Sequence, residues 1–267
     1  MEEMRLNKYL SDRGVCSRRE ADRLIGAGRI TVNGHGAVPG EKVTEEDVIL
    51  VDGKPVRSST PEKLILAVHK PAGVVCTTKR FPGEENIVDM VDFKTRLYPV
   101  GRLDKDSEGL IFLTNDGAFA EEVTKASNRH EKEYEVTVGR AYSDAFLKRM
   151  GKGVYLKDLD RTTAACSVEK ISERTFRIVL TQGLNRQIRR MCEVCGYEVT
   201  ALKRVRIMNV RLGDLKPRAY RKVEGEELET LLRQVKRKKP AGTGAEGAAK
   251  KSAVQGTAVN APKRRPS

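Results

Sequence analysis

Apolar positions in the first part of the chain follow two spacings. They recur every three or four residues from Leu6 to Leu10 and again from Ala21 to Ile25, which predicts two short helices. Ile30–Val32 and Val48–Val51 are β-prone and are followed by Asn-Gly and Asp-Gly pairs, which favour tight turns between strands. Two small helices packed against short strands predict a compact module over residues 4–60.

The chain from residue 64 to residue 235 mixes strand and helix patterns without a regular alternation. Leu64–Val68 and Leu110–Leu113 are continuous apolar runs of the kind that buried strands make, whereas residues 133–138 alternate like a half-buried strand. Further β-prone segments are 74–77, 176–180 and 199–210, and helices are predicted at 118–125, 146–150, 185–195 and 228–235. We therefore predict an α+β domain over residues 64–235, with a mixed, mainly antiparallel sheet.

Residues 236–267 differ from the rest of the chain in composition. The segment contains no Ile, Leu, Phe, Met or Tyr and is rich in Ala, Gly, Lys and Pro, so it cannot bury enough apolar surface to fold. We predict a disordered basic tail that adds non-specific electrostatic affinity for a polyanionic partner.

The charge balance of the chain indicates a polyanionic partner. The 267 residues carry 51 Lys and Arg against 37 Asp and Glu, a net charge of +14, and the tail accounts for only part of that excess. Nucleic acid is the usual partner of such a chain. No apolar stretch is long enough for a membrane span, the first residues lack a secretion signal, and five cysteines without a pairing pattern suit a reducing compartment. We expect a cytoplasmic protein.

Motifs for metal, nucleotide and redox chemistry are weak in this sequence. Cys192 and Cys195 form a lone CxxC, but a structural zinc site needs four ligands and the sequence has no second pair. The three histidines are scattered, and neither Gly-Lys pair is followed by the Ser or Thr of a P-loop. We therefore expect no cofactor and no metal.

Two groups of basic residues stand out. The predicted N-terminal module exposes mostly positive side chains, and Arg18 and Arg19 fall in the first turn of a helix, where cations oppose the helix dipole. Contact with phosphates would explain that placement, and a solvated charged face is the alternative. In the second group Arg186, Arg189 and Arg190 have helical i, i+3 and i+4 spacing, so we expect an anion against them.

A charge-dense loop leads directly into the predicted strand at 110–113. It contains Arg102, Asp104, Lys105 and Asp106, and charges so close to a buried strand are costly unless they are paired or used. We predict that this loop places the carboxylate of Asp104 at the floor of a groove, with cations beside it.

The order of motifs in the N-terminal module resembles the S4 RNA-binding domain. The motifs are Arg-Leu-Asn-Lys-Tyr-Leu from residue 5, Cys-Ser-Arg-Arg-Glu-Ala-Asp from residue 16 and Gly-Arg-Ile-Thr-Val-Asn-Gly from residue 28. S4 domains grip structured RNA through this helical face. The resemblance therefore implies backbone contacts from Lys8, Arg18, Arg19 and Arg29.

The segment from Gly101 to Gly117 resembles the catalytic motif of RNA pseudouridine synthases, in the branch that carries an S4 domain and modifies ribosomal RNA. Lys70-Pro-Ala-Gly73, Lys132-Glu-Tyr134 and the Gln-Gly-Leu-Asn-Arg-Gln-Ile-Arg-Arg-Met run from residue 182 follow in the family's order. Residues 128–134 and 204–210 are most similar to a large-subunit subfamily called type F. The resemblance covers about residues 4–225, all of both predicted domains except their ends.

The resemblance also implies roles for the site residues. Asp104 is the implied nucleophile, attacking C1′ or C6 of uridine, and Arg189 the cation that keeps it ionised. Tyr134, which by position alone would more often be a core residue, is implied to stack on the base and to serve in removing the C5 proton. Arg102 is expected to fill the stack vacated by a flipped base. Further expected RNA contacts are Leu103, Lys105, Arg186, Gln187 and Arg190.

The expected activity is the isomerisation of uridine to pseudouridine in large-subunit ribosomal RNA, by a monomer without a cofactor. Two alternatives stay open. The same chemistry could act on small-subunit or transfer RNA, or the chain could be a non-catalytic RNA-binding assembly factor that has kept the fold. The presence of Asp104, Tyr134 and Arg189 argues against the second alternative.

Overall fold

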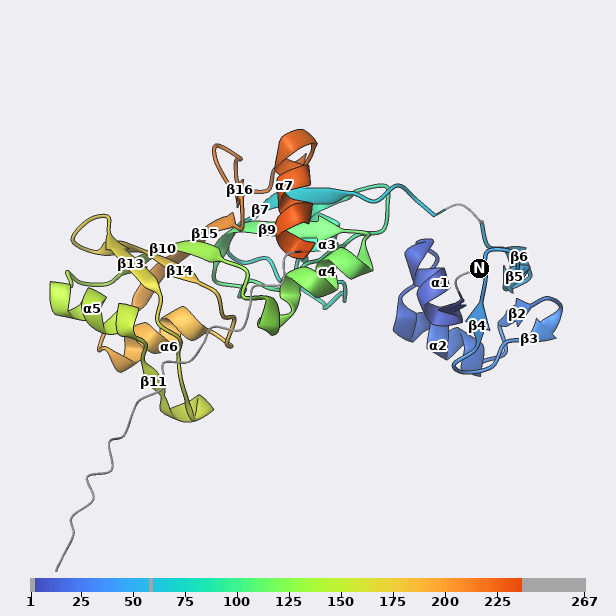
Figure 1. The fold of residues 1–267 in the computed structure, drawn as a ribbon, viewed down its shortest axis with the longest axis horizontal. Coiled ribbons are helices and arrows are strands. Elements are labelled where there is room, and N and C mark those ends of the chain that lie inside the picture. The colour runs from blue at the N-terminus through green and yellow to red at the C-terminus, as the bar shows by residue number, and fades with distance from the viewer. Residues whose placement is uncertain (1–2, 58–59, 237–267) are drawn as a thin grey trace, which may run out of the picture.

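The chain forms a small N-terminal unit and a larger sheet domain, arranged one after the other along the long axis of the molecule (Figure 1). This computed structural model describes residues 3–57 and 60–236. The predicted disordered tail therefore lies, apart from its first residue, outside the described residues. Within the described ranges no helix has both the length and the apolar character needed to cross a membrane.

The N-terminal unit consists of the helices and strands that its hydrophobic spacing predicts. Helices α1 (Leu6–Asp12) and α2 (Arg18–Gly26) share one core with the strands, and Leu10 and Ala21 are fully buried in it. Ser17 caps α2 by accepting a hydrogen bond from the Glu20 N–H at 3.1 Å. The strands are β2 (Ile30–Val32), β3 (His35–Gly36), β5 (Ile49–Val51) and β6 (Lys54–Pro55) in the order β3-β2-β5-β6, with β1 (Met4–Arg5) paired to β4 (Lys42–Val43).

The larger domain is organised on one mixed sheet of nine strands. In sheet order these are β13 (Ser167–Lys170), β14 (Thr175–Leu180), β10 (Lys132–Val138), β15 (Val199–Ile207), β9 (Glu108–Thr114), β7 (Ile65–Lys70) and β17 (Tyr220–Lys222). Strand β16 (Val210–Arg211) pairs with β15, and β8 (Tyr98–Pro99) pairs with β9. A separate hairpin joins β11 (Tyr155–Leu156) to β12 (Arg161–Thr162). Within the nine-stranded sheet only β15 and β9 run parallel, which confirms the α+β prediction.

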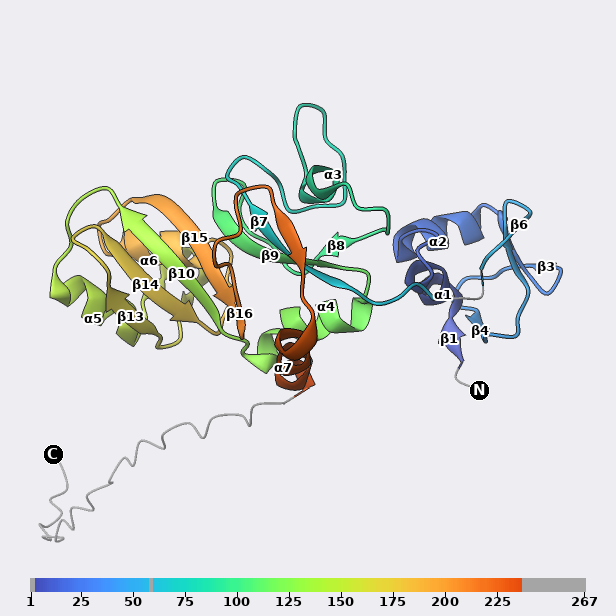
Figure 2. The same ribbon diagram turned by 90° about the horizontal axis from the view of Figure 1, so that it is seen from above.

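Helices cover both faces of the sheet in the half that contains β7 and β9 (Figure 2). Helices α4 (Gly117–Thr124) and α7 (Gly225–Lys236) pack on the face that carries Ala67 and Phe112. Helix α3 (Ile87–Val91) packs on the opposite face, against Val68 and Ile111. Strands buried on both faces need apolar residues at every position, which explains the continuous runs in the sequence.

The other half of the sheet is covered by helices on one face. Helices α5 (Asp144–Lys152) and α6 (Gln187–Val194) contribute Phe146 and Ile188 to a core with Val136 and Phe176. The uncovered face carries charged side chains, including Glu133, which accepts a hydrogen bond from Arg206 Nε at 2.6 Å. One covered face accounts for the alternating pattern of β10.

The two halves meet where β15 and β9 run parallel, and a glycine permits this junction. The parallel pairing covers only two positions, one of which joins Arg204 to Gly109. Gly109 has a φ of +115°, and a Cβ atom there would lie 2.3 Å from the Arg204 carbonyl oxygen. Only glycine fits this position, and the close approach places the loop before β9 next to β15, where the two halves of the sheet meet.

Two local predictions are wrong in detail. Residues 74–77 form no strand, although Val75 makes an isolated bridge. The helix predicted from residue 185 begins at Gln187, because Arg186 adopts a left-handed φ of 49°. Arg186 therefore shares no helical face with the two arginines that follow it.

Candidate active site

The loop that carries Asp104 lies between β8 and β9 and is held in place by hydrogen bonds from Lys70. The Lys70 ammonium donates to the carbonyl oxygens of Pro71 (2.7 Å), Lys105 (3.3 Å) and Ser107 (2.6 Å). The side chain is fully buried, and this burial lowers the pKa of Lys70. Three acceptors match the three N–H groups of an ammonium, so a buried cation is tolerated here and the loop is clamped.

Asp104 faces a cleft of about 320 Å³ at the seam between the two halves. Tyr134 on β10 and Arg204 on β15 line this cleft together with Asp104, and Arg102 and Leu103 line it from the loop. The Asp104 side chain is 32% exposed. Its carboxylate is therefore within reach of a ligand that enters the cleft, as the sequence predicts.

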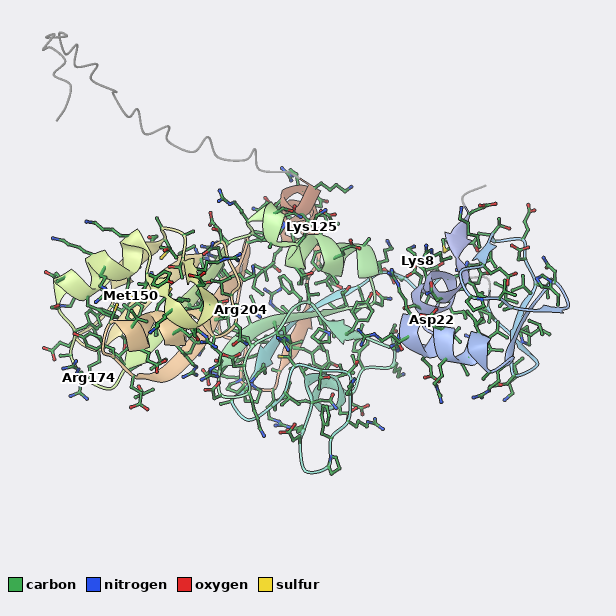
Figure 3. All side chains as sticks on the ribbon, turned by 90° about the horizontal axis from the view of Figure 1, so that it is seen from below. Lys8, Asp22, Lys125, Met150, Arg174 and Arg204 are labelled. Atoms are coloured by element: carbon green, nitrogen blue, oxygen red, sulfur yellow. The ribbon has the colours of Figure 1, made fainter. Side chains whose placement is uncertain are left out.

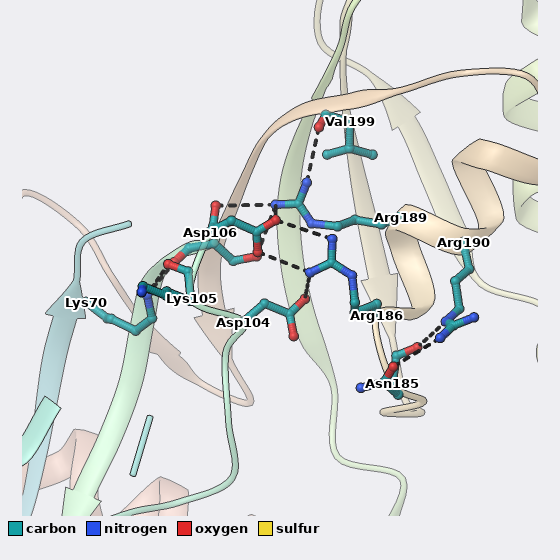
Figure 4. A network of polar contacts seen from close by, with 10 residues as sticks. Lys70, Asp104, Lys105, Asp106, Asn185, Arg186, Arg189, Arg190 and Val199 are labelled. Carbon is teal, nitrogen blue, oxygen red and sulfur yellow. Dashed lines mark hydrogen bonds and ion pairs between the residues drawn. The ribbon is translucent and has the colours of Figure 1, made fainter. Parts of the chain in front are cut away.

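Arg186 and Arg189 hold the Asp104 loop in different ways (Figure 4). Arg186 Nη1 lies 3.4 Å from Asp104 Oδ2 and 3.3 Å from Asp106 Oδ1. Arg189 Nη2 lies 3.2 Å from Asp106 Oδ2 and donates to the Asp106 carbonyl oxygen and to Ser107 Oγ, while its Nη1 donates to the Val199 carbonyl oxygen.

The expected ion pair between Asp104 and Arg189 is wrong in this structure. The cation at Asp104 is Arg186, because its left-handed backbone turns the side chain towards the loop. Arg189 is instead occupied by Asp106 and by the start of β15, and its side chain is only 14% exposed. Arg189 therefore holds the loop in place through Asp106, and Arg186 supplies the positive charge next to the Asp104 carboxylate.

Asp106 is the partner that the two arginines share. Burial acts to raise the pKa of its carboxyl, but the hydrogen bond from Arg186 and the charges of Arg189 and Arg186 together bring the pKa below its usual value. Asp106 thus keeps a negative charge that ties α6 to the loop. Sequence analysis missed this positioning role, although Asp106 lies two residues after Asp104 in the charge-dense loop.

The remaining residues expected near the cleft are placed unevenly. Arg102 is exposed beside Asp104, whereas Lys105 donates to Glu84 Oε1 at 2.9 Å and does not line the cleft. Gln187 lines it but is buried, and its Oε1 accepts the Leu184 N–H at 3.1 Å. Arg190 donates to the Asn185 carbonyl oxygen at 2.9 Å and forms an ion pair with Asp158. Acidic side chains of the protein therefore lie against all three arginines, Asp106 against Arg186 and Arg189 and Asp158 against Arg190, although no single anion is shared by the three.

The expected RNA-binding residues of the N-terminal unit lie on a surface separate from the cleft. Figure 3 shows Lys8 at that end of the molecule, and its ammonium pairs with Asp12 at 2.7 Å. Arg29 forms a two-pronged pair with Asp52, at 2.7 and 2.5 Å. Arg18 and Arg19 are exposed in the first turn of α2. Whether this surface binds phosphates stays a prediction.

The two units touch through a polar contact. Arg96, in the loop before β8, donates to the carbonyl oxygen of Cys16 at 3.0 Å. Arg18 also approaches the larger domain, since its guanidinium lies near Gly117 at the start of α4. One of the expected RNA contacts therefore lies at the boundary between the units.

Possible metal ligands do not gather in the described part of the chain. Among those residues no group of three or more His, Cys, Asp or Glu side chains is arranged to hold a metal ion. The five cysteines are free. Cys192 of the lone CxxC is buried in α6, and burial raises the pKa of its thiol to about 12, which makes it a poor thiolate ligand.

Family models match both units of the chain. The model described as RNA pseudouridylate synthase matches residues 64–194, and the S4 domain model matches residues 4–49. A solved structure described as the crystal structure of pseudouridylate synthase has a TM-score of 0.63 and 25% identity, covering 85% of this chain and 99% of that chain.

Curated relatives extend the match across both units. The chain is 48% identical to the dual-specificity RNA pseudouridine synthase RluF of Salmonella typhi, over 86% of this chain and 79% of the relative. It is 32% identical to the ribosomal large subunit pseudouridine synthase B of Bacillus subtilis, over 85% and 95% of the two chains. The chain therefore belongs to the RNA pseudouridine synthase family, in the RluF-like branch that joins an S4 domain to the catalytic domain.

Proposed function

We propose that this protein isomerises uridine to pseudouridine in large-subunit ribosomal RNA, with Asp104 as the nucleophile. The single observation that supports this most is the Asp104 carboxylate, which lies in a cleft beside Tyr134, 3.4 Å from a guanidinium. The large-subunit substrate follows the name of the Bacillus subtilis relative. In this proposal residues 4–60 bind RNA, residues 64–235 catalyse, and the chain acts as a cytoplasmic monomer.

The chemistry explains the types of residue that line the cleft. The N1–C1′ bond of uridine breaks, the uracil turns, and a C5–C1′ bond forms after the C5 proton has left. The reaction has no net redox change and consumes no nucleotide, so it requires no cofactor. A carboxylate can attack either C1′ or C6. Arg186 contacts the Asp104 carboxylate directly, and Arg189 binds Asp106 in the same loop, so the two arginines together hold Asp104 in position.

The target uridine has to leave its RNA helix before it can meet Asp104. Base flipping costs a few kcal/mol, and a side chain that occupies the vacated stack reduces that cost. Arg102 is exposed at the cleft next to Asp104, which suits this role. Tyr134 would stack on the flipped uracil, and Leu103 would pack beside it.

Further contacts would orient the RNA on the protein. Exposed cations provide affinity for phosphates without sequence preference. Candidate cations are Lys105, Arg186 and Arg190 on the catalytic domain and Lys8, Arg18, Arg19 and Arg29 on the S4 domain, whereas the buried Gln187 would meet a base edge from the wall of the cleft. Several of these already have acidic partners that RNA would have to displace, such as Glu84 for Lys105 and Asp52 for Arg29.

The proposal is tested by mapping pseudouridines in ribosomal RNA from a strain that lacks the gene. Carbodiimide modification and primer extension should show the loss of pseudouridine at one or a few large-subunit positions. Restoring the gene should restore the signal, whereas Asp104→Asn should not, although its RNA binding stays intact. Asp144→Asn, which changes an exposed carboxylate in the first turn of α5, is the matched control and should restore it.

A second substrate class is favoured by one observation. The relatives with 48% identity carry the name dual-specificity, so this chain could also modify a second kind of RNA. Mapping small-subunit and transfer RNA from the same strains would reveal it. Unchanged pseudouridines in large-subunit RNA would reject the first proposal, and unchanged pseudouridines in every RNA would leave a non-catalytic assembly factor.

A further inference from the structure

Two cations in the wall of the cleft have no acidic partner among the described residues. Arg204 on β15 is 3% exposed, and its Nε donates to the Leu110 carbonyl oxygen at 2.7 Å. Its Nη2 is buried and finds no hydrogen-bond partner within residues 3–57 and 60–236. Figure 3 shows Arg204 in the middle of the molecule, where the two halves of the sheet meet. A buried guanidinium nitrogen without a partner is costly and calls for an acceptor.

Lys132 is the second cation of this wall. It lies two residues before Tyr134 on β10 and lines the same cleft, where its ammonium donates to the His130 carbonyl oxygen at 3.3 Å. Within the described part of the chain neither Lys132 nor Arg204 forms an ion pair. Burial, with the Arg204 charge as a further cause, lowers the pKa of Lys132 to about 8. Two like charges held together in a partly dry site destabilise the fold unless a ligand uses them.

The position of these cations indicates which part of an RNA substrate they meet. Besides Arg102, Lys125 and Arg186 are the more exposed cations of the cleft, and these two suit phosphates at its rim. Arg204 lies deeper, and its guanidinium carbon is 6.0 Å from the centre of the Tyr134 ring. A base that stacks on Tyr134 would therefore bring its polar edge towards Arg204 and Lys132.

We propose that Lys132 and Arg204 bind the carbonyl oxygens of the flipped uracil and stabilise the negative charge that develops on the base. This inference rests on the proposed function. If Asp104 attacks C1′, the N1–C1′ bond breaks and its electron pair stays on the uracil, where O2 and O4 share the charge. If Asp104 attacks C6, the electrons of the C5–C6 double bond move towards O4. In both routes a uracil oxygen becomes anionic, and cationic donors stabilise it.

Lys132 also connects the rate to pH. In the free enzyme its ammonium loses its charge as the pH rises through about 8, so the wild-type rate measured below saturation should fall there. Other titratable or charged groups that line the same cleft are Arg102, Asp104, Lys125, His130, Tyr134, Arg186 and Arg204. Lys132→Arg keeps a positive charge at every working pH and should therefore abolish the fall above pH 8 while it preserves most of the rate.

The experiment measures pseudouridine formation in single-turnover reactions with a large-subunit RNA transcript and an excess of enzyme. Lys132→Met should lower the rate constant about 100-fold and leave the dissociation constant for RNA within about twofold. The melting temperature of Lys132→Met at pH 7 should equal or exceed that of the wild type, because a charge held at a cost to stability is gone. Lys148→Met, an exposed change on α5, is the control and should alter none of these quantities.

Arg204 supplies an independent variant. Arg204→Lys keeps the charge but loses the fork that reaches both Leu110 and the cleft, so its rate should fall while the pH dependence from Lys132 persists. Arg204 also holds β9 through its hydrogen bond to Leu110, so its variants could lose stability. In that case the rate and binding constants of Lys132→Met alone test the inference.

Three outcomes would overturn the inference. A Lys132→Met enzyme as fast as the wild type would reject it while leaving the proposed function in place. An unchanged rate constant with weaker binding and a smaller salt slope would make Lys132 a phosphate contact instead. A wild-type enzyme that forms no pseudouridine in any RNA would reject the proposed function and this inference together.

Discussion

The S4 unit and the cleft of the catalytic domain are both rich in cations, but they hold them differently. On the S4 unit Arg29 and Lys8 are exposed or half-buried and pair locally with Asp52 and Asp12. Such surface charges are screened by salt and attract RNA in any orientation. At the loop that carries Asp104, Arg189 is 14% exposed and donates to backbone and side-chain oxygens at 3.1 to 3.4 Å. In the proposed function the first region would collect RNA and the second would orient one nucleotide.

The largest difference is expected from glycine substitutions. Gly109→Ala would place a Cβ atom 2.3 Å from a carbonyl oxygen at the seam of the sheet, and should destabilise the catalytic domain by on the order of 3 kcal/mol. Gly40→Ala changes an S4 glycine with a φ of +84° and open space around it, and should cost about 1 kcal/mol. Urea unfolding followed separately in each domain checks both values. Equal effects would show that the seam tolerates a side chain.

The two arginines that hold the Asp104 loop should separate catalysis from stability. Arg186→Met removes the guanidinium beside Asp104 and should lower the single-turnover rate about 100-fold with little loss of stability. Arg189→Met frees the loop at Asp106 and Ser107 and should lower both the rate and the free energy of unfolding, the latter by about 2 kcal/mol. Rate constants and thermal melts of the same preparations distinguish them. An Arg186→Met enzyme with the wild-type rate would return the role to Arg189.

Charge reversal on the S4 unit should change binding rather than chemistry. Arg18→Glu with Arg19→Glu should weaken RNA binding about tenfold at low salt and flatten the dependence of the dissociation constant on salt. The rate constant of bound RNA should stay the same. Filter binding between 50 and about 300 mM salt measures the slope. Reversal of Lys148 and Arg149 on α5 is the control, and an equal effect there would identify these arginines as merely solvated.

The smallest effect concerns two aspartates with lowered pKa values. The pKa of Asp106 is lowered by Arg186 and Arg189 despite burial, and that of Asp52 by the hydrogen bond from Arg29. A lowered pKa stabilises the fold above the unfolded value, near 4, and this contribution disappears as the pH falls through the folded value. Asp106→Asn and Asp52→Asn should therefore differ from the wild type in unfolding free energy at pH 7 more than at pH 3. Only Asp106→Asn should also slow the reaction.

Local patterns in the sequence predicted most of the fold. The apolar runs of β7 and β9 predicted buried strands, because a strand that is covered on both faces is apolar at successive positions and this pattern can be read from the local sequence. The capping signal at Ser17 and the charge-dense loop before β9 are likewise local. These features predicted where Asp104 would lie, and the family resemblance supplied the role proposed for it.

Only the tertiary structure decided which groups meet. A single left-handed residue at Arg186 takes it off the helix and onto Asp104, and leaves Arg189 to Asp106. Three other features also depend on contacts between segments far apart in the chain. They are the hydrogen bonds from Lys70 to the Asp104 loop, the close approach of Gly109 to Arg204, and the burial of Arg204 Nη2. The spacing of apolar residues predicts which face of a helix or strand is buried. It does not predict which helices and strands pack against each other, because that is determined by the packing of the whole domain.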